Sequence, residues 1–441
     1  RKRPLGFWPK GTPVPPDPPE EVAERARDEA ELAELRRRRA ASADPEKALE
    51  QERKRRWEAS KQRRAEARAR KAEALRDRRD AWEARRALGI VHAGPGDSGG
   101  LQGSASDVEA LTRRGLPVLH TAADLASAMD LELKTLRWLT YHRRGATVVH
   151  YHRYEIAKKT GGVRHISAPK PALEFAQRWV LDMILRELDP EPQAHGFVPG
   201  RSITTNAAPH AGKAVVVNMD LRDFFPSITF RRTKGLFHRL GYGEQVSTVL
   251  ALLCTEPPRV PTSIDGKTYH VSLGARVLPQ GACTSPAITN ALCRKLDRRL
   301  DGLARRHHFT YTRYADDLTF SGDNVRAVGR LLRSARSIVQ AEGLTEHPRK
   351  TRVMRRSGRQ EVTGLTVNDR PTVPRSQLRQ LRAILHNSAR FGLESQNRDG
   401  RANFAAYLRG RVEYACMVDP AKALALREAL ARALRGPDRV S

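Results

Sequence analysis

The sequence contains few cysteines and no long apolar run. It has four cysteines, with no Cys-x-x-Cys pair and no adjacent histidine cluster, which argues against a disulfide framework or a zinc site and favours buried thiols. No run of about 18 apolar residues is present to form a membrane span. The Pro-rich, charged start does not resemble a signal peptide. We therefore expect a cytoplasmic protein with no membrane partner.

Acidic residues are too few to balance the basic ones. The 441 residues include 80 Lys and Arg but only 50 Asp and Glu, which leaves a net charge of +30. Such an excess creates a positive potential that attracts polyanions, so we expect a nucleic-acid partner, with non-specific binding as the alternative. The length is sufficient for two or three domains with their own cores.

Large apolar residues are also scarce in the N-terminal region. Residues 12–20 are Pro-rich and expected to be extended. Residues 21–88 are mostly Ala, Arg, Glu and Lys, and their opposite charges at three- and four-residue spacing predict long solvated helices. RNA contact and a charged arm without a specific role remain equally open. The five glycines of residues 94–106 predict a flexible linker, so residues 1–105 form a charged helical extension with a linker.

Ordered structure is expected to resume after this linker. Thr121 has the pattern of an N-cap with Asp124 as its capping-box partner. We expect two packed helices there, rather than a helix-turn-helix, from the spacing of Leu125, Met129, Leu133, Leu136 and Leu139. From about Thr147 short apolar segments alternate with amphipathic helices. After Pro371 the chain is helical and basic, with an apolar stripe at Leu378, Leu381, Ile384 and Leu385.

Three aspartates occupy positions typical of a metal-dependent site. The apolar run Val215–Val217 leads into Asp220, and two alternating segments flank Asp316 and Asp317, which predicts a β-hairpin with carboxylates at its tip. Nucleotidyl transfer uses two Mg²⁺ ions, which prefer hard oxygen ligands. An Asp-Asp pair by itself is also common in polar turns. The combination with Asp220 is more specific.

Several motifs resemble those of one enzyme family. The Tyr314–Asp317 box, Asp220 and the Leu278–Pro286 segment resemble the motifs of reverse transcriptases, with Cys283 standing where proline is more usual. Asn206–His210 resembles the Asn-Ala-x-x-His element of the retron branch, and Val362–Gly364 resembles its Val-Thr-Gly element. Together with the charged extension, these motifs most resemble myxobacterial retron enzymes, most strongly over residues 161–368.

This resemblance implies an α+β, right-hand polymerase fold. Fingers and a palm with an antiparallel sheet would occupy residues 106–369, and a helical basic thumb residues 370–441. The implied activity is RNA-directed DNA synthesis from a structured non-coding RNA, with dNTPs and two Mg²⁺ ions. It would begin at a 2′-hydroxyl and yield branched RNA–DNA (msDNA) in a retron anti-phage defence system with an effector protein. Other bacterial reverse transcriptases (intron maturase-like or diversity-generating) and a non-catalytic RNA-binding scaffold are the alternatives. A maturase would normally carry a further domain after the thumb.

The resemblance also assigns roles to individual residues. It implies that metal is held by Asp220, Leu221, Asp316 and Asp317. Lys350 is expected to protonate the leaving pyrophosphate, or to contact phosphate. Nucleotide binding is implied for Arg164, Phe225, Gln280, Gly281 and Ala315.

For two of these nucleotide-site residues the resemblance implies a specific role. Arg164 would grip the triphosphate through its forked guanidinium, with a solvated surface position as the alternative. Phe225 would act as a steric gate against a 2′-hydroxyl, whereas Phe224 belongs to the core.

A further group is expected to contact RNA or DNA. It comprises Arg201, Asn206, His210, Arg375, Arg379 and Arg382. Arg201 lies in the loop His195–Ser202, which resembles a template-contacting segment. For His210, a structural hydrogen-bonding role is favoured over catalysis.

Overall fold

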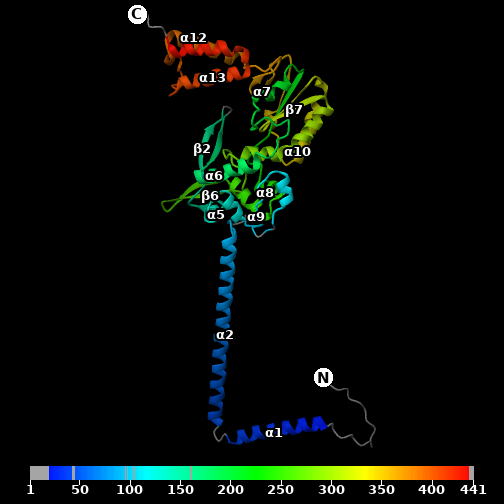
Figure 1. Cartoon of the computed structure of the whole chain (residues 1–441), viewed down its shortest axis with the longest axis vertical. Coiled ribbons are helices and arrows are strands. Elements are labelled where there is room, and N and C mark those ends of the chain that lie inside the picture. Colours follow the sequence, from blue (N-terminus) through cyan, green and yellow to red (C-terminus); the bar gives the residue numbers. More distant parts are fainter. Residues whose placement is uncertain are drawn as a thin grey trace, which may run out of the picture. The chain divides into compact units, whose positions relative to one another are not determined.

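A computed structural model describes residues 19–41, 45–94, 96, 98–101, 103, 105–158 and 161–436 (Figure 1). The chain divides into two units, Arg1–Ala84 and Arg85–Ser441, which are described separately. Most of the Pro-rich segment expected to be extended lies outside the described residues. Within the described part, no helix combines the length and the apolar composition that crossing a membrane requires.

The N-terminal region consists of two long helices, α1 (Pro19–Ala41) and α2 (Pro45–Leu88). From Glu46 to Leu88 the sequence has no Gly, Pro or β-branched residue, so almost every position favours helix. Ion pairs one turn apart add support, such as Arg56 with Glu52 at 2.8 Å and Arg79 with Glu83 at 2.9 Å. The predicted solvated helices are confirmed.

The segment after α2 differs from the flexible linker that its glycines predict. Ile90, Ala93 and Leu101 are almost completely buried in the core. The Gln245 side-chain amide donates to the Leu101 carbonyl at 2.8 Å, and the Ser98 hydroxyl donates to the Gly94 carbonyl at 2.9 Å. The described part of this segment is therefore packed, because its few apolar residues find partners in the second unit.

The two packed helices expected next are present. Thr121 caps the helix α4 (Ala122–Ala128), and a complete capping box with Asp124 confirms the prediction. Leu125, Met129, Leu136 and Leu139 are buried. The other helices of this region are α3 (Val108–Arg113) and α5 (Leu133–Thr140).

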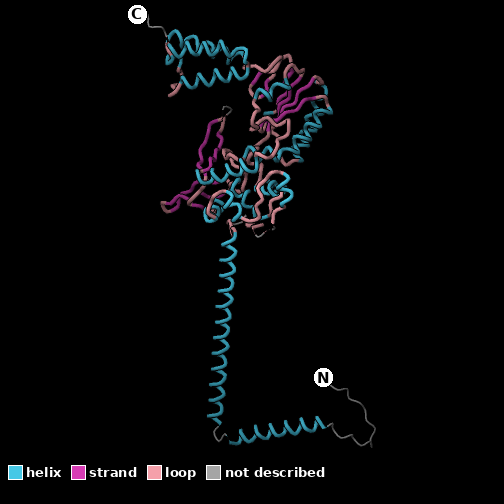
Figure 2. The backbone as a smooth tube through the Cα atoms, in the orientation of Figure 1, coloured by secondary structure: helices cyan, strands magenta, loops and turns pink. Residues whose placement is uncertain are grey.

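The fingers contain two small antiparallel β-structures (Figure 2). One is the hairpin of β2 (Tyr151–Ala157) and β3 (Val163–Pro169). Lys159 and Thr160, between these strands, lie outside the described residues. The other is a sheet of β1 (Gly145–Ala146), β6 (Lys267–Ser272) and β5 (Arg259–Ile264). The associated helices are α6 (Pro171–Val180), α8 (Phe230–Leu240) and α9 (Glu244–Cys254). The short helix α7 (Ile203–Ala207) lies instead against strand β7 (Phe309–Tyr314) of the palm.

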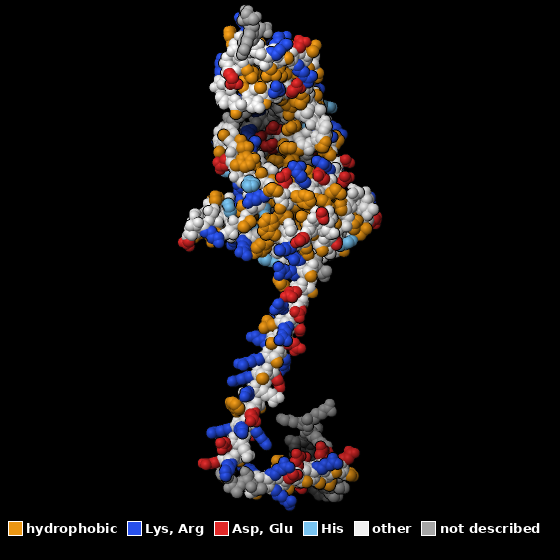
Figure 3. Space-filling view, turned by 60° about the vertical axis from the view of Figure 1, so that its left-hand side comes forward, with side chains coloured by type: hydrophobic (Ala, Val, Ile, Leu, Met, Phe, Trp, Pro, Cys, Tyr) orange, Lys and Arg blue, Asp and Glu red, His pale blue; other side chains and the backbone are white. Residues whose placement is uncertain are grey.

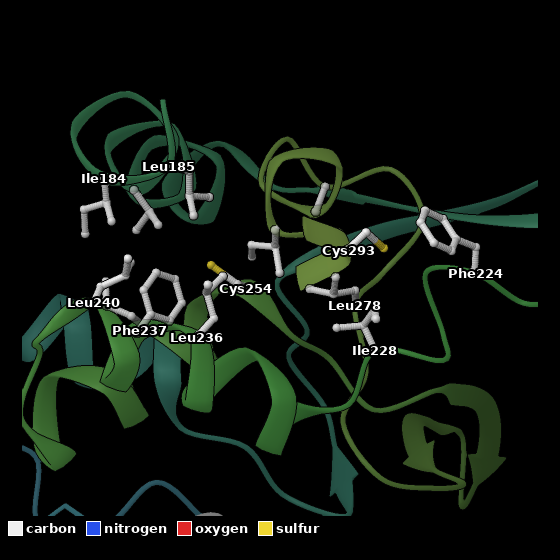
Figure 4. Packing of buried hydrophobic residues seen from close by; sticks show 14 of the residues in the cluster. Ile184, Leu185, Phe224, Ile228, Leu236, Phe237, Leu240, Cys254, Leu278 and Cys293 are labelled. Carbon is white, nitrogen blue, oxygen red and sulfur yellow. The ribbon is translucent and has the colours of Figure 1, made fainter. Parts of the chain in front are cut away.

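The palm is a four-stranded antiparallel sheet in the order β7-β8-β4-β9. Helix α10 (Ser285–Arg306) packs against β7, and α11 (Val328–Ala341) packs against α10. Fingers and palm share one core, part of which is formed by Ile184 and Leu185 near Phe237 of α8 (Figure 4). The four strands are β7 (Phe309–Tyr314), β8 (Asp317–Gly322), β4 (Val215–Asp220) and β9 (Arg352–Arg355).

The C-terminal region is a bundle of three helices, and its core also includes Ala207 of α7 and Val216 of β4. Leu381 and Leu385 of the predicted stripe are buried there, and Leu378 and Ile384 are partly buried. A short hairpin of β10 (Glu361–Val362) and β11 (Leu365–Thr366) precedes the bundle. The helices are α12 (Arg375–Phe391), α13 (Phe404–Val418) and α14 (Ala423–Arg435). The α+β class with an antiparallel sheet and a helical C-terminal region is confirmed.

Candidate active site

The three aspartates meet at one end of the palm sheet. Asp220 is the last residue of β4 and lies directly opposite Asp317, the first residue of β8. Asp316 lies in the turn between β7 and β8, and its carbonyl accepts a 3.0 Å hydrogen bond from the N–H of Leu221. This register brings carboxylates from distant parts of the chain to the same end of the sheet.

The convergence of these carboxylates is electrostatically unfavourable without a cation. Burial, together with the charges of Asp316 and Asp220, raises the pKa of the Asp317 carboxyl to about 7. Burial and the charge of Asp220 also raise the pKa of Asp316, while the positive charges of Lys350 and Arg164 act against that rise. Negative charge is therefore crowded at this end of the sheet.

Lys350 places a positive charge directly against this cluster. Its ammonium nitrogen lies 2.9 Å from Oδ1 and 3.1 Å from Oδ2 of Asp220, so it engages the whole carboxylate. Among the described residues, no three His, Cys, Asp or Glu side chains already have the arrangement of a metal site. The donors are nevertheless hard carboxylate oxygens crowded together, which is the chemistry that a divalent cation requires. The residues present fit such an ion.

A buried ion pair that the sequence reasoning missed holds the acidic turn. Arg313 of β7, 1% exposed, donates to both oxygens of Asp297 in α10 at 2.8 Å. It also donates to Asn290 at 3.1 Å and to the carbonyl of Ala315 at 3.2 Å. Burial alone would lower the pKa of Arg313, but the Asp297 carboxylate raises it above its ordinary value. The feature of the sequence that indicates this ion pair is Asp297, an acidic residue between the apolar positions of α10.

The turn itself is conformationally demanding. Ala315 has a φ of +56°, a left-handed conformation that is costly for a residue with a side chain. A Cβ at Gly196 would come within 2.4 Å of the Ala315 nitrogen, so only glycine allows this approach. Ala315 is 8% exposed. Because its side chain is buried, the nucleotide contact expected of Ala315 would be made by its backbone.

Asn206 and His210 are completely buried, which corrects the expectation that they contact RNA or DNA. The His210 ring is within 2.7 Å of the hydroxyl oxygens of Thr312 in β7 and Ser321 in β8. This geometry agrees with the structural role favoured for His210. It joins the Asn206–His210 element to the hairpin that carries the acidic pair.

His210 should make stability depend on pH. Burial lowers the pKa of its imidazole to about 3, from an ordinary value of 6.5, so the folded state keeps the ring neutral. The unfolded state takes up the proton first, and stability is therefore complete above pH 6.5 and is lost as pH falls toward 3. Denaturant titrations should show the wild-type unfolding free energy falling relative to His210→Gln by up to about 1.4 kcal/mol per pH unit. Parallel pH profiles for the two proteins would contradict this assignment.

Three of the residues expected around the nucleotide come together at strand β3 of the fingers. Arg164 is exposed on β3, opposite Ile156, and its charge acts on Asp316. The carbonyl of Gln280 accepts a 2.8 Å hydrogen bond from the N–H of Ser167 on the same strand. Gly281 has a φ of +118°, and a Cβ there would lie 2.8 Å from Ile166. Gln280 and Gly281 thus dock the strand that carries Arg164.

The two phenylalanines after Asp220 have different environments. Phe224 is 4% exposed and belongs to the core, as predicted. Phe225 is only partly buried, and its ring centroid lies 6.2 Å from that of the exposed Phe197. Phe225, whose ring is not completely buried, therefore stays a candidate for the gate.

The remaining predicted contacts divide into two kinds. Arg201 donates through one guanidinium nitrogen to the backbone carbonyls of Glu191, Pro192 and Ala194, so it supports its own loop, and its contact with a template strand stays a prediction. Arg375, Arg379 and Arg382 are exposed on α12, where their spacing places them on one face. They stay candidates for nucleic-acid contact.

Comparison with known proteins adds independent information. A family model for reverse transcriptase (RNA-dependent DNA polymerase) matches residues 156–384. The retron Mx65 reverse transcriptase of Myxococcus xanthus is 48% identical over 317 residues, which cover 72% of this chain and 73% of that protein. The retron Mx162 enzyme of the same species is 46% identical over 367 residues, covering 78% and 75%. The retron Ec86 enzyme of Escherichia coli is 35% identical over 280 residues, covering 63% and 81%.

The fold and the acidic end of its sheet define a polymerase of the right-hand class. The chain belongs to the reverse transcriptase family, within its retron branch, and is an RNA-directed DNA polymerase. Its family generally uses divalent metal ions and an RNA template.

Proposed function

We propose that Asp220, Asp316 and Asp317, with the backbone of Leu221, hold two Mg²⁺ ions for template-directed addition of dNTPs. The pairing of Asp220 with Asp317 across β4 and β8 carries this proposal, because it gathers the carboxylates at one place. The ions would acidify the attacking hydroxyl and stabilise charge on the triphosphate. Holding two such ions requires carboxylates that lie close together, as the register of β4 and β8 places them.

The cationic side chains around this cluster would act on the triphosphate. Arg164 would bind its oxygens in a forked geometry, and its electrostatic effect on Asp316 supports that location. Lys350 would hold the phosphates, or donate a proton to the departing pyrophosphate, since its ammonium lies within hydrogen-bond distance of Asp220. Gln280 and Gly281 would keep the Arg164 strand in position.

Phe225 would exclude ribonucleotides by clashing with a 2′-hydroxyl. In the Phe225→Ala protein, discrimination between dNTPs and rNTPs should fall by about 10–100-fold, because the obstructing ring is gone. Single-nucleotide incorporation with each substrate measures this ratio. Phe224→Ala is the control: it should cost about 3–5 kcal/mol of stability and leave the ratio unchanged. An unchanged ratio in Phe225→Ala would reject the gate.

We further propose that synthesis begins at a 2′-hydroxyl of a cognate structured RNA and yields branched RNA–DNA. Identities of 48% and 46% to retron enzymes of Myxococcus xanthus support this assignment over an intron maturase-like or diversity-generating enzyme. In this setting the product and an effector protein would act in anti-phage defence.

The nucleic acid that co-purifies with the protein tests this proposal. RNase treatment of the wild-type material should leave DNA that still carries a nucleotide linked through its 2′-hydroxyl, which a debranching enzyme removes. Protein with Asp316→Asn should bring down the same RNA without DNA. Recovery of unrelated cellular RNA, or of DNA with an unbranched 5′ end, would contradict the proposed priming.

A further inference from the structure

Helix α2 separates its charges into two faces. From Glu52 to Leu88 it carries fifteen Lys or Arg and seven Asp or Glu. At about 100° per residue, the acidic residues fall within one arc of about 140°. Only three basic side chains, Arg55, Arg70 and Arg76, share that arc, and the other twelve occupy the opposite side. Figure 3 shows the division, with Lys and Arg mainly at the left of the helix and Asp and Glu mainly at the right.

The basic face also carries large apolar side chains along its middle. Trp57, Leu75 and Trp82 fall within about 20° of one another around the axis. They are 63%, 58% and 42% exposed. The Lys61 ammonium lies 5.1 Å from the centroid of the Trp57 ring. Aromatic rings among basic side chains are typical of nucleic-acid surfaces, where they stack on bases while the cations contact phosphate.

Neither folding nor solubility requires this segregation. From Pro45 to Ala87 the described side chains of α2 are exposed, apart from the partly exposed Ser60, so no core selects the pattern. A solvated helix gains most from opposite charges spread around it, where each turn offers ion pairs. Gathering the acidic residues on one arc reduces the number of such pairs. It also leaves a positive strip, about 50 Å long between Arg53 and Arg86.

The shape of the strip indicates which polyanion it fits. The apolar residues are too widely spaced for the a and d positions of a coiled coil, and basic residues lie between them. This disfavours a second copy of the chain. A straight, cationic rod complements a duplex, and double-stranded RNA presents its phosphates and 2′-hydroxyls across a wide, shallow minor groove.

We propose that the basic face of α2 binds the phosphate backbone of double-stranded segments of an RNA. This surface belongs to α2 alone and would hold structured RNA in addition to the strand being copied. The inference rests on the proposed function only in naming RNA as the polyanion. The electrostatic argument itself depends on α2 alone.

Two triple variants of the full chain with equal charge loss test this surface. One replaces Arg64, Arg68 and Lys71 of the basic face by glutamine, and the other replaces Arg55, Arg70 and Arg76 of the acidic arc. Glutamine preserves helix propensity, which circular dichroism would verify. The probe is a blunt RNA duplex of about 20 base pairs, with affinity measured by fluorescence anisotropy over a range of salt concentrations.

The basic-face variant should bind the duplex at least about tenfold more weakly at low salt. Its slope of log affinity against log salt should be shallower by about 2 to 3, and that of the control by less than about 1. Equal slopes for the two variants would overturn the proposal, as would loss of self-association with unchanged RNA affinity. Primer extension on a short unstructured RNA should match wild type in both. Absence of extension in all three proteins would defeat the proposed function without affecting the binding comparison.

Discussion

Replacing Asp316 by asparagine should reduce primer extension on an RNA template by at least about 10³-fold. The amide keeps the shape of the side chain but removes a charge from the group that would bind the metal ions. Their stabilisation of the transition state amounts to several kcal/mol, and each 1.36 kcal/mol is a factor of ten in rate. Because burial and Asp220 already oppose ionisation of Asp316, the neutral variant should fold normally.

A matched substitution separates this effect from a general loss of charge. Asp182→Asn makes the same chemical change on an exposed residue whose partner is Arg186, at 2.7 Å. It should leave extension at the wild-type level. Equal incorporation by the wild-type and Asp316→Asn proteins would reject the catalytic role and favour a non-catalytic RNA-binding scaffold.

Replacing Asp297 by alanine should destabilise the protein by about 3–5 kcal/mol, because Arg313 would keep a buried charge without its partner. That loss is a large fraction of the stability of an ordinary domain. Asp301→Ala, one turn further along α10, removes a pair whose Arg305 partner is 74% exposed. It should cost no more than about 1 kcal/mol. Urea denaturation of the three proteins provides the comparison.

A double substitution tests whether the same pair also positions the acidic turn. Asp297→Leu with Arg313→Met removes both charges and should recover most of the stability, since apolar replacements of buried pairs are often neutral. It cannot restore the hydrogen bond from Arg313 to the Ala315 carbonyl. Extension should therefore stay reduced while folding is restored. Full activity in the double variant would limit the pair to a role in stability.

Local patterns were sufficient to predict the elements that carry the aspartates. An apolar run ending at Asp220 predicts a buried strand, and the alternation on both sides of Asp316 predicts the hairpin. The capping box at Thr121 depends on residues three positions apart, so it could also be predicted from the sequence. In each case the physical cause lies within a few residues of the feature.

Features that depend on partners distant in the sequence could not be predicted from local patterns. The sequence shows His210 as a loop histidine, but its environment is set by Thr312 and Ser321, more than one hundred residues away. The segment around Leu101 has the composition of a linker, yet Gln245 helps to hold it in place. Arginine is a residue type that commonly binds phosphate, so the sequence alone indicates a phosphate ligand at Arg201. Only the folded loop shows that its guanidinium donates to backbone carbonyls.

Cleavage by a bound metal tests most directly whether the three carboxylates share one ion-binding site. Fe²⁺ would replace Mg²⁺ in the full chain, and ascorbate with peroxide would generate radicals that cut the backbone beside the ion. The pairing of β4 with β8 predicts two cleavage positions, near Asp220 and near Asp316 and Asp317, both suppressed by excess Mg²⁺ and both absent in the Asp316→Asn protein. Cleavage near one segment alone, or at positions unaffected by Asp316→Asn, would contradict a shared site.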